Sequence, residues 1–258
     1  MANEIKLWNK VLAGVMQVPG VKVNRESFLK EYLSVYCTEK QVTLALEKGT
    51  IGIIDEKILD EIALECISNH TKLVTGSSVL LGLPGGWAML GSIPGDVAQY
   101  YFHVFVLSQK LAYIYGYPDL CDEKGNFTEI ASGMLTIFVG VMSGVGIANK
   151  FIQELAESAQ KEVVKRIPKY ALTKTFYYPI LKQIAKWLGR ELTKDSFAKS
   201  VSKFVPIIGG IVSGFLSYST FKPQSKRLMF KLKNSMLLAY ENKMKENLKN
   251  SDDNSQKS

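Results

Sequence analysis

A possible acid–base site lies where an uncharged stretch gives way to a helical one. Asp96, Tyr100 and His103 are spaced i, i+4 and i+7, which places them on one face of the helix predicted over residues 96–115. A carboxylate that orients an imidazole can make that imidazole a general base. The chain has no GxSxG motif that would supply a nucleophilic serine. Two interpretations follow: a catalytic face, or Asp96 stabilising the helix start and His103 as an interior polar residue.

Two loops have the residue types of ligand-binding loops but not their spacing. The turn over residues 116–123 carries three carboxylates, Asp119, Asp122 and Glu123, and it misses the spacing of an EF-hand. A solvated turn is the expectation there, with a cation site as the alternative. The loop over residues 83–86 is glycine-rich and lacks the Lys-Ser/Thr of a P-loop. Close helix packing or a bend at a membrane explains it better than phosphate binding.

The metal-ligating residue types are sparse. The three cysteines fit no metal motif, and two histidines are too few for a His-rich site. The sequence therefore predicts no metal and no cofactor, and its small, odd number of cysteines suits a reducing compartment. These residues are Cys37, Cys66, Cys121, His70 and His103.

The elements that position these residues are all predicted to be helical. Apolar residues recur at helical spacing, and no segment keeps a period of two, so we expect nine to eleven helices and no sheet. Asn24 is a predicted N-cap, Thr38 and Gln41 a predicted capping box, and Gly49 a helix end. The helices are expected over residues 3–17, 25–36, 39–48, 55–72, 96–115, 150–167, 169–189 and 224–248.

Three long runs carry no charge: residues 73–95, 130–149 and 204–221. Each is about as long as the roughly 20 residues that span a bilayer. Each also contains a GxxxG spacing, which favours close helix packing: Gly82–Gly86, Gly140–Gly144 and Gly210–Gly214. Gly85 and Gly209 add to these glycines. We expect Gly-rich apolar helical hairpins that enter or dock on a membrane, and a buried hairpin in a helix bundle is the alternative.

Charge is unevenly distributed along the chain. Residues 1–129 hold 11 Lys/Arg and 15 Asp/Glu, whereas residues 130–258 hold 21 and 9. A basic half suits a polyanionic partner. The last helix, with apolar residues among its cations, suits anionic lipid headgroups, and docking on the protein's own core is the alternative. We see no nucleic-acid recognition motif. The cations expected to bind an anionic surface are Lys222, Lys226, Arg227, Lys231 and Lys233.

Two blocks of the chain resemble the EcsC family. Residues 75–117 contain a Gly-rich apolar stretch, a Pro-x-Asp element at 94–96 and a helix that ends in Tyr115-Gly116. Residues 203–222 contain Pro-x-x-Gly-Gly followed by an aromatic stretch. The likeness covers residues 25–235 and implies a helical, bacterial-type, membrane-associated protein. It implies no catalytic residues that could be carried over.

The sequence thus predicts a membrane-associated helical accessory protein without catalytic activity, and a hydrolase around Asp96 and His103 is the alternative. Its first helix is interrupted by charges, unlike a signal peptide. We expect the protein at the cytoplasmic face of the membrane, or moving between that face and the cytoplasm, with a protein partner or a second copy bound through apolar helices. Three regions are expected: amphipathic helices over 1–72, the EcsC-like core over 73–248 and a disordered tail over 249–258.

Overall fold

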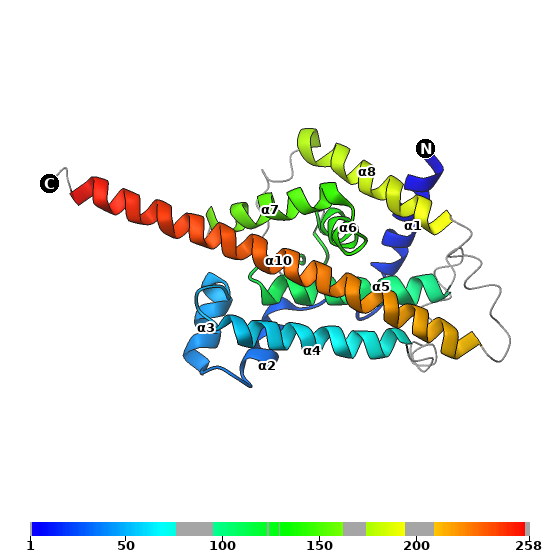
Figure 1. Ribbon diagram of the computed structural model, residues 1–258, viewed down its shortest axis with the longest axis horizontal. Helices are drawn as coiled ribbons and strands as arrows, with labels where there is room; N and C mark the ends of the chain where they lie inside the picture. The colour runs from blue at the N-terminus through cyan, green and yellow to red at the C-terminus, as the bar shows by residue number, and fades with distance from the viewer. Residues whose placement is uncertain are drawn as a thin grey trace.

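The computed structural model describes residues 2–75, 95–122, 124–128, 130–161, 174–193 and 209–255. Within these ranges the chain forms nine packed α-helices and no strand, which confirms the all-α prediction (Figure 1). The Gly-rich hairpins are not shown, and the three expected regions stay a prediction. The helices are α1 (Ala2–Val15), α2 (Arg25–Leu33), α3 (Glu39–Lys48), α4 (Glu56–Thr75), α5 (Gly95–Ile114), α6 (Ala131–Met142), α7 (Gly146–Lys161), α8 (Lys174–Thr193) and α10 (Gly209–Ser255).

The early helices begin and end where local chemistry predicts. The Asn24 side chain accepts a hydrogen bond from the backbone N–H of Ser27 at 2.8 Å. Thr38 and Gln41 form the reciprocal capping box, and Gly49 follows α3 with φ 95°. These caps satisfy backbone groups that a helix end leaves without partners. Helix positions in this part of the chain are therefore set by nearby residues.

Helix α6 lies at the centre of the bundle. Every residue of α6 except Ser132 is buried, and the helix contacts α1, α5, α7, α8 and α10. Figure 1 shows it nearly end-on, with the other helices around it. The Trp8 indole of α1 donates a hydrogen bond to the Thr136 hydroxyl of α6 at 3.0 Å. A helix that is apolar on all sides belongs in such a core.

The second uncharged run, residues 130–149, does not form one long helix. Helix α6 ends at Met142, Gly144 adopts φ 80°, and α7 begins at Gly146. The 12 residues of α6 rise only about 18 Å, short of the roughly 30 Å hydrocarbon core of a bilayer. Among the described helices, none combines the length and the apolarity that a membrane span needs. For this run the structure supports the buried core helix.

Helix α10 corrects two predicted boundaries. It runs unbroken from Gly209 to Ser255, so the described part of the third apolar run and the basic helix form one element. Pro223 lies inside it on the exposed side, between the buried residues Phe221 and Ser225. Proline costs a helix one backbone hydrogen bond, and the packing of these neighbours offsets that loss. Residues 249–255, expected in a disordered tail, continue a helix that is already formed and so need no new nucleation.

The two ends of α10 differ in their surroundings. Its middle packs against α4, α5, α6 and α7. The buried positions of α10 stop at Ala239, and residues 241–251 are exposed apart from a half-buried Lys243. Figure 1 shows this last part projecting beyond the other helices.

Candidate functional site

The two histidines of the chain meet inside the bundle, which their sequence spacing does not predict. His70 of α4 and His103 of α5 place their Nδ1 atoms 3.3 Å apart, with 5% and 3% of their surfaces exposed. One ring must donate the shared proton and the other accept it. His103 Nε2 is buried without a hydrogen-bond partner. Because orphaned buried N–H groups are rarer than orphaned acceptors, we assign the shared proton to Nδ1 of His103.

Burial keeps both rings neutral. It lowers the pKa of His70 to about 3 and that of His103 to about 4, with Lys110 adding to both shifts. A general base works best when its pKa lies near the working pH, and these values lie well below neutrality. The pair therefore suits a structural hydrogen bond between α4 and α5 better than proton transfer at neutral pH.

The two described side chains of the predicted catalytic face have different partners. The Tyr100 hydroxyl donates to Gln224 Oε1 of α10 at 2.7 Å, whereas His103 faces His70 of α4. Burial raises the pKa of Tyr100, so its hydroxyl keeps its proton. Asp96 lies in the first turn of α5, and its side chain is outside the described part of the structure. A catalytic role for Asp96, Tyr100 and His103 stays a prediction.

Two carboxylates of the 116–123 turn accept hydrogen bonds from groups close to them in the sequence. Asp119 accepts a hydrogen bond from the Tyr113 hydroxyl at 2.9 Å, and Asp122 accepts two from backbone N–H groups of the turn. Glu123 lies outside the described residues. Across the described ranges no group of three His, Cys, Asp or Glu side chains could hold a metal ion. These contacts favour the structural explanation of the turn.

The predicted glycine contacts divide into three cases. A Cβ on Gly140 would lie 2.9 Å from Ile184 of α8 and 3.1 Å from Ala148 of α7, so this glycine permits close helix packing. Gly144 instead ends α6, so the two do not share a helix face. Gly209, Gly210 and Gly214 lie in α10, where the structure does not describe their surroundings. Gly82, Gly85 and Gly86 are outside the described residues.

Arg227 and Lys233, which were predicted for an anionic surface, have binding partners within the protein. Arg227 donates to the carbonyl oxygen of Met142 at 2.7 Å, which satisfies an acceptor at the end of α6. Lys233 lies 2.7 Å from Asp60 Oδ2 and 3.2 Å from Glu56 Oε2, both on α4. Burial works against its charge, but these hydrogen bonds outweigh that effect and raise the pKa of Lys233. Both cations therefore fasten α10 to the bundle.

The remaining cations flank an exposed apolar side of α10. Lys222, Lys226 and Lys231 are half-buried. Phe230 and Leu238 lie on the outward side with 54% and 46% of their surfaces exposed. Residues 222–238 hold five cations and no acidic residue. We call this outward side of residues 222–238 the basic face of α10; sequence reasoning found its cations but missed that Phe230 and Leu238 point away from the core.

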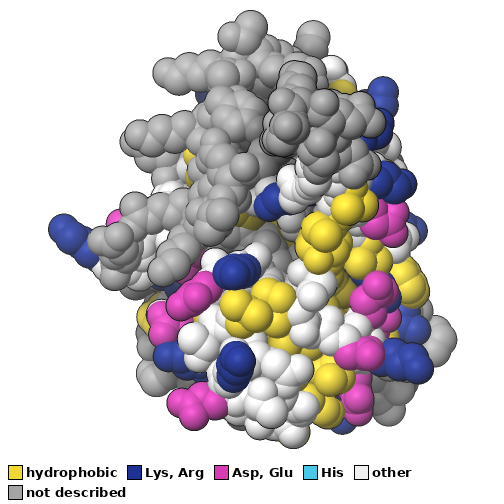
Figure 2. Space-filling model, turned by 90° about the vertical axis from the view of Figure 1, so that its left-hand side faces the viewer, with side chains coloured by type: hydrophobic (Ala, Val, Ile, Leu, Met, Phe, Trp, Pro, Cys, Tyr) yellow, Lys and Arg dark blue, Asp and Glu magenta, His cyan; other side chains and the backbone are white. Residues whose placement is uncertain are grey.

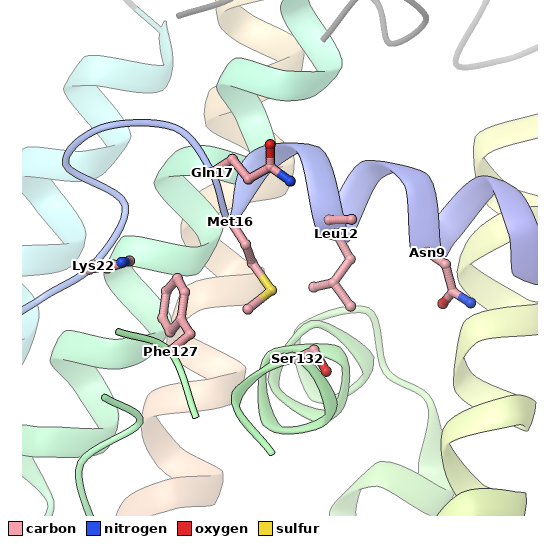
Figure 3. A pocket seen from close by; sticks show the side chains of 8 residues that line it. Asn9, Leu12, Met16, Gln17, Lys22, Phe127 and Ser132 are labelled. Atoms are coloured by element: carbon pink, nitrogen blue, oxygen red, sulfur yellow. The ribbon is translucent and has the colours of Figure 1, made fainter. Parts of the chain in front are cut away.

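A shallow groove lies between α1, the turn at Phe127 and the start of α6 (Figure 3). Its volume is about 580 Å³. Leu12 and Met16 point across it toward α6, and the Phe127 ring faces Met16. Lys22 is the one charged residue among its described lining, and its Nζ lies 5.9 Å from the centre of the Phe127 ring. The described lining of this groove includes apolar side chains and one cation but no acid–base pair.

Comparison with known proteins yields no match to a protein-family model, to a curated protein or to a solved structure. The resemblance to the EcsC family therefore stays a prediction based on residues 75–117 and 203–222.

Proposed function

We propose that this protein is a membrane-associated helical accessory protein, of the kind that the resemblance to the EcsC family implies, with no catalytic activity. Its basic face docks on the anionic cytoplasmic surface of a membrane. The Gly-rich segments over residues 73–95 and 204–221 are further candidates for lipid contact. The observation that carries the proposal is Phe230, an exposed aromatic ring that lies among cations on the outward side of α10.

The basic face combines lysines with apolar side chains, which suits the charged headgroups and the apolar acyl chains of a membrane. Its lysines can reach phosphate groups while their aliphatic stems lie along apolar surface. Each basic residue near an anionic membrane contributes about 1 kcal/mol of attraction. Phe230 and Leu238 add apolar area that can enter the boundary between headgroups and acyl chains. Because Arg227 and Lys233 are held by protein partners, Lys226 and Lys231 are the cations that we expect to matter most.

The alternative function, a hydrolase around Asp96 and His103, has less support. His103 is buried against His70, and burial holds the pKa of both rings low. Tyr100 is engaged with Gln224. An accessory role uses the exposed side of the protein, whereas a hydrolase needs a base that substrate can reach.

Sedimentation with vesicles tests the proposal. We expect the protein to bind vesicles of phosphatidylcholine with 30% phosphatidylglycerol, to bind pure phosphatidylcholine at least tenfold more weakly, and to lose affinity as salt rises. The double variant K226E/K231E should bind the anionic vesicles at least tenfold more weakly than the unchanged protein. Phe230→Ser should weaken binding severalfold and leave the salt dependence intact.

The matched control is K10E/K40E, which makes the same change in net charge at two exposed lysines on α1 and α3. It should bind nearly as well as the unchanged protein. Equal losses in the two double variants would show that net charge alone acts. That result, or equal binding to both vesicle types, would contradict docking through the basic face.

A further inference from the structure

The projecting end of α10 has a different surface from the basic face. Residues 241–251 leave the other helices behind (Figure 1) and carry both signs of charge, with Glu241 and Glu246 among the lysines. Leu238, three residues before this part, and Leu248 within it are 46% and 63% exposed. Most of the stability of a helix in a protein comes from packing an apolar side against other elements. This end therefore presents an apolar side with no packing partner among the described residues.

Four residues of this end share one side of the helix. At 3.6 residues per turn, Leu238, Glu241, Lys245 and Leu248 fall within about 80° of one another around the axis. Their order along the helix is Leu, Glu, Lys, Leu. We call these four residues the α10 end face.

When two copies of this face run in opposite directions, each residue lies opposite one that complements it. If two such helices lie antiparallel about a point at residue 243, Glu241 of each meets Lys245 of the other. Leu238 of each then meets Leu248 of the other. A two-fold interface requires this relation, in which residue i contacts j and j contacts i. Both the charges and the apolar side chains satisfy it in a single register.

We infer that the α10 end face binds the same face of a second copy of this chain, as an antiparallel helix pair. The charge complementarity of Glu241 with Lys245 favours this occupant over an anionic membrane. A membrane would attract the lysines and repel Glu241, which lies in the middle of the face. Figure 2 shows side chains of both signs of charge on the face that the molecule presents at this end, whereas residues 222–238 hold five cations and no acidic residue.

The contact is short, so we expect a reversible dimer. Stable interfaces bury about 1,200–2,000 Å² in total, more than three helical turns on each side supply. The inference needs no vesicle, and its tests change Glu241, Lys245 and Leu248, which lie outside the basic face. Leu238 is the one residue that belongs to both faces. Dimerisation and lipid binding can fail separately.

Analytical ultracentrifugation over a range of protein concentration tests this inference. The full chain, without lipid, should shift from monomer to dimer as concentration rises. Leu248→Glu should weaken dimerisation at least tenfold, because the two-fold symmetry makes each substitution count twice. Leu64→Glu, at a leucine of α4 with 42% exposure, is the matched control and should leave the dimer unchanged.

A charge swap tests the antiparallel register. E241K places two lysines opposite each other and K245E two carboxylates, so each single variant should weaken the dimer severalfold. The double variant E241K/K245E restores opposite charges and should recover most of the affinity. Circular dichroism should show an unchanged helix content in all variants. A chain that stays monomeric at every concentration, a dimer that Leu248→Glu leaves intact, or a double variant no better than the singles would overturn the inference.

Discussion

At the scale of single residues, Gly52 shows how the start of the chain meets its last helix. Gly52 has φ 81°, and a Cβ there would overlap the hydroxyl oxygen of Tyr240 on α10. Tyr240 follows the last buried position of α10 at Ala239. Gly52 therefore leaves room for the side chain of Tyr240, at the point where α10 begins to project from the bundle.

Gly52→Ala should lower the free energy of unfolding by about 2–4 kcal/mol. Roughly 1–2 kcal/mol would come from a left-handed backbone at a residue with a Cβ, and the rest from displacing Tyr240. Gly125→Ala is the matched control, because Gly125 has φ 72° and nothing within 4 Å of its Cβ position. Urea unfolding measures both. Equal losses in the two variants would show that the contact with Tyr240 costs nothing.

The buried histidine pair makes stability depend on pH. Folding lowers the pKa of His70 to about 3 and of His103 to about 4, whereas an exposed histidine titrates near 6.5. Between pH 4 and 6.5 the unfolded chain thus binds more protons, so stability is full above pH 6.5 and falls as pH drops. At pH 5 we expect a loss of roughly 2 kcal/mol for each histidine.

Urea unfolding at pH 7 and pH 5 measures this loss. The variant His70→Gln/His103→Gln has no ring to protonate, so its stability should change less over this range. A loss of the same size in the variant and in the unchanged protein would assign the pH dependence to other groups.

At the scale of elements, one carboxylate of α4 joins α10 to the residue that follows α5. Asp60 Oδ2 accepts from Lys233 at 2.7 Å, and Asp60 Oδ1 accepts from the Tyr115 hydroxyl at 2.9 Å. Only 16% of the Lys233 side chain and 32% of the Asp60 side chain are exposed. This shielding makes the pair stronger than an ion pair at the surface, which contributes about 0–1 kcal/mol.

A double-mutant cycle with Asp60→Asn and Lys233→Met should therefore give a coupling free energy of about 1–2 kcal/mol. Thermal or urea unfolding of the four proteins provides it. A coupling below about 0.3 kcal/mol would show that α10 is held by its buried apolar side alone.

The sequence predicted the helix boundaries that depend on neighbouring residues. It did not predict those that depend on packing against residues far away in the chain. Asn24, the Thr38–Gln41 pair and Gly49 act within their own helix ends, so their roles were readable in advance. Gly144 was expected to pack within a helix, yet it ends α6, because the chain turns there to surround α6 with other helices. Pro223 was expected to precede a helix, yet buried neighbours carry α10 through it.

For the candidate site, too, the sequence predicted the helix face but not its contacts with other helices. The spacing of Asp96, Tyr100 and His103 identifies a helix face, but it cannot name what faces them. His103 meets His70 of another helix, and Tyr100 meets Gln224 near the other end of the sequence. Likewise, the pattern marked Arg227 and Lys233 as cations of an exposed side, and the fold uses them to bind α6 and α4. Such pairings depend on the tertiary arrangement.

At the scale of the whole molecule, burial falls from α6 at the centre of the bundle to the projecting end of α10, where we propose that a second copy binds. Helix α6 is buried among five other helices, whereas residues 241–251 of α10 are exposed apart from the half-buried Lys243. Amide protons of fully buried elements exchange only when the whole protein unfolds, and those of frayed helix ends exchange through local opening. The chain thus combines a centre that is buried on all sides with a helix end that is largely exposed.

Hydrogen exchange measured by mass spectrometry should reveal this gradient. Amides of residues 134–142 should exchange with the free energy of global unfolding, and their exchange should accelerate with denaturant. Amides of residues 241–251 should exchange orders of magnitude faster and show little dependence on denaturant. If the helix pair forms, raising the protein concentration should slow exchange in residues 238–248 while leaving α6 unchanged. In the Leu248→Glu variant that concentration dependence should disappear, which separates protection by a second copy from protection within one chain. Slow exchange over residues 241–251 at every concentration would mean that the bundle itself orders this end.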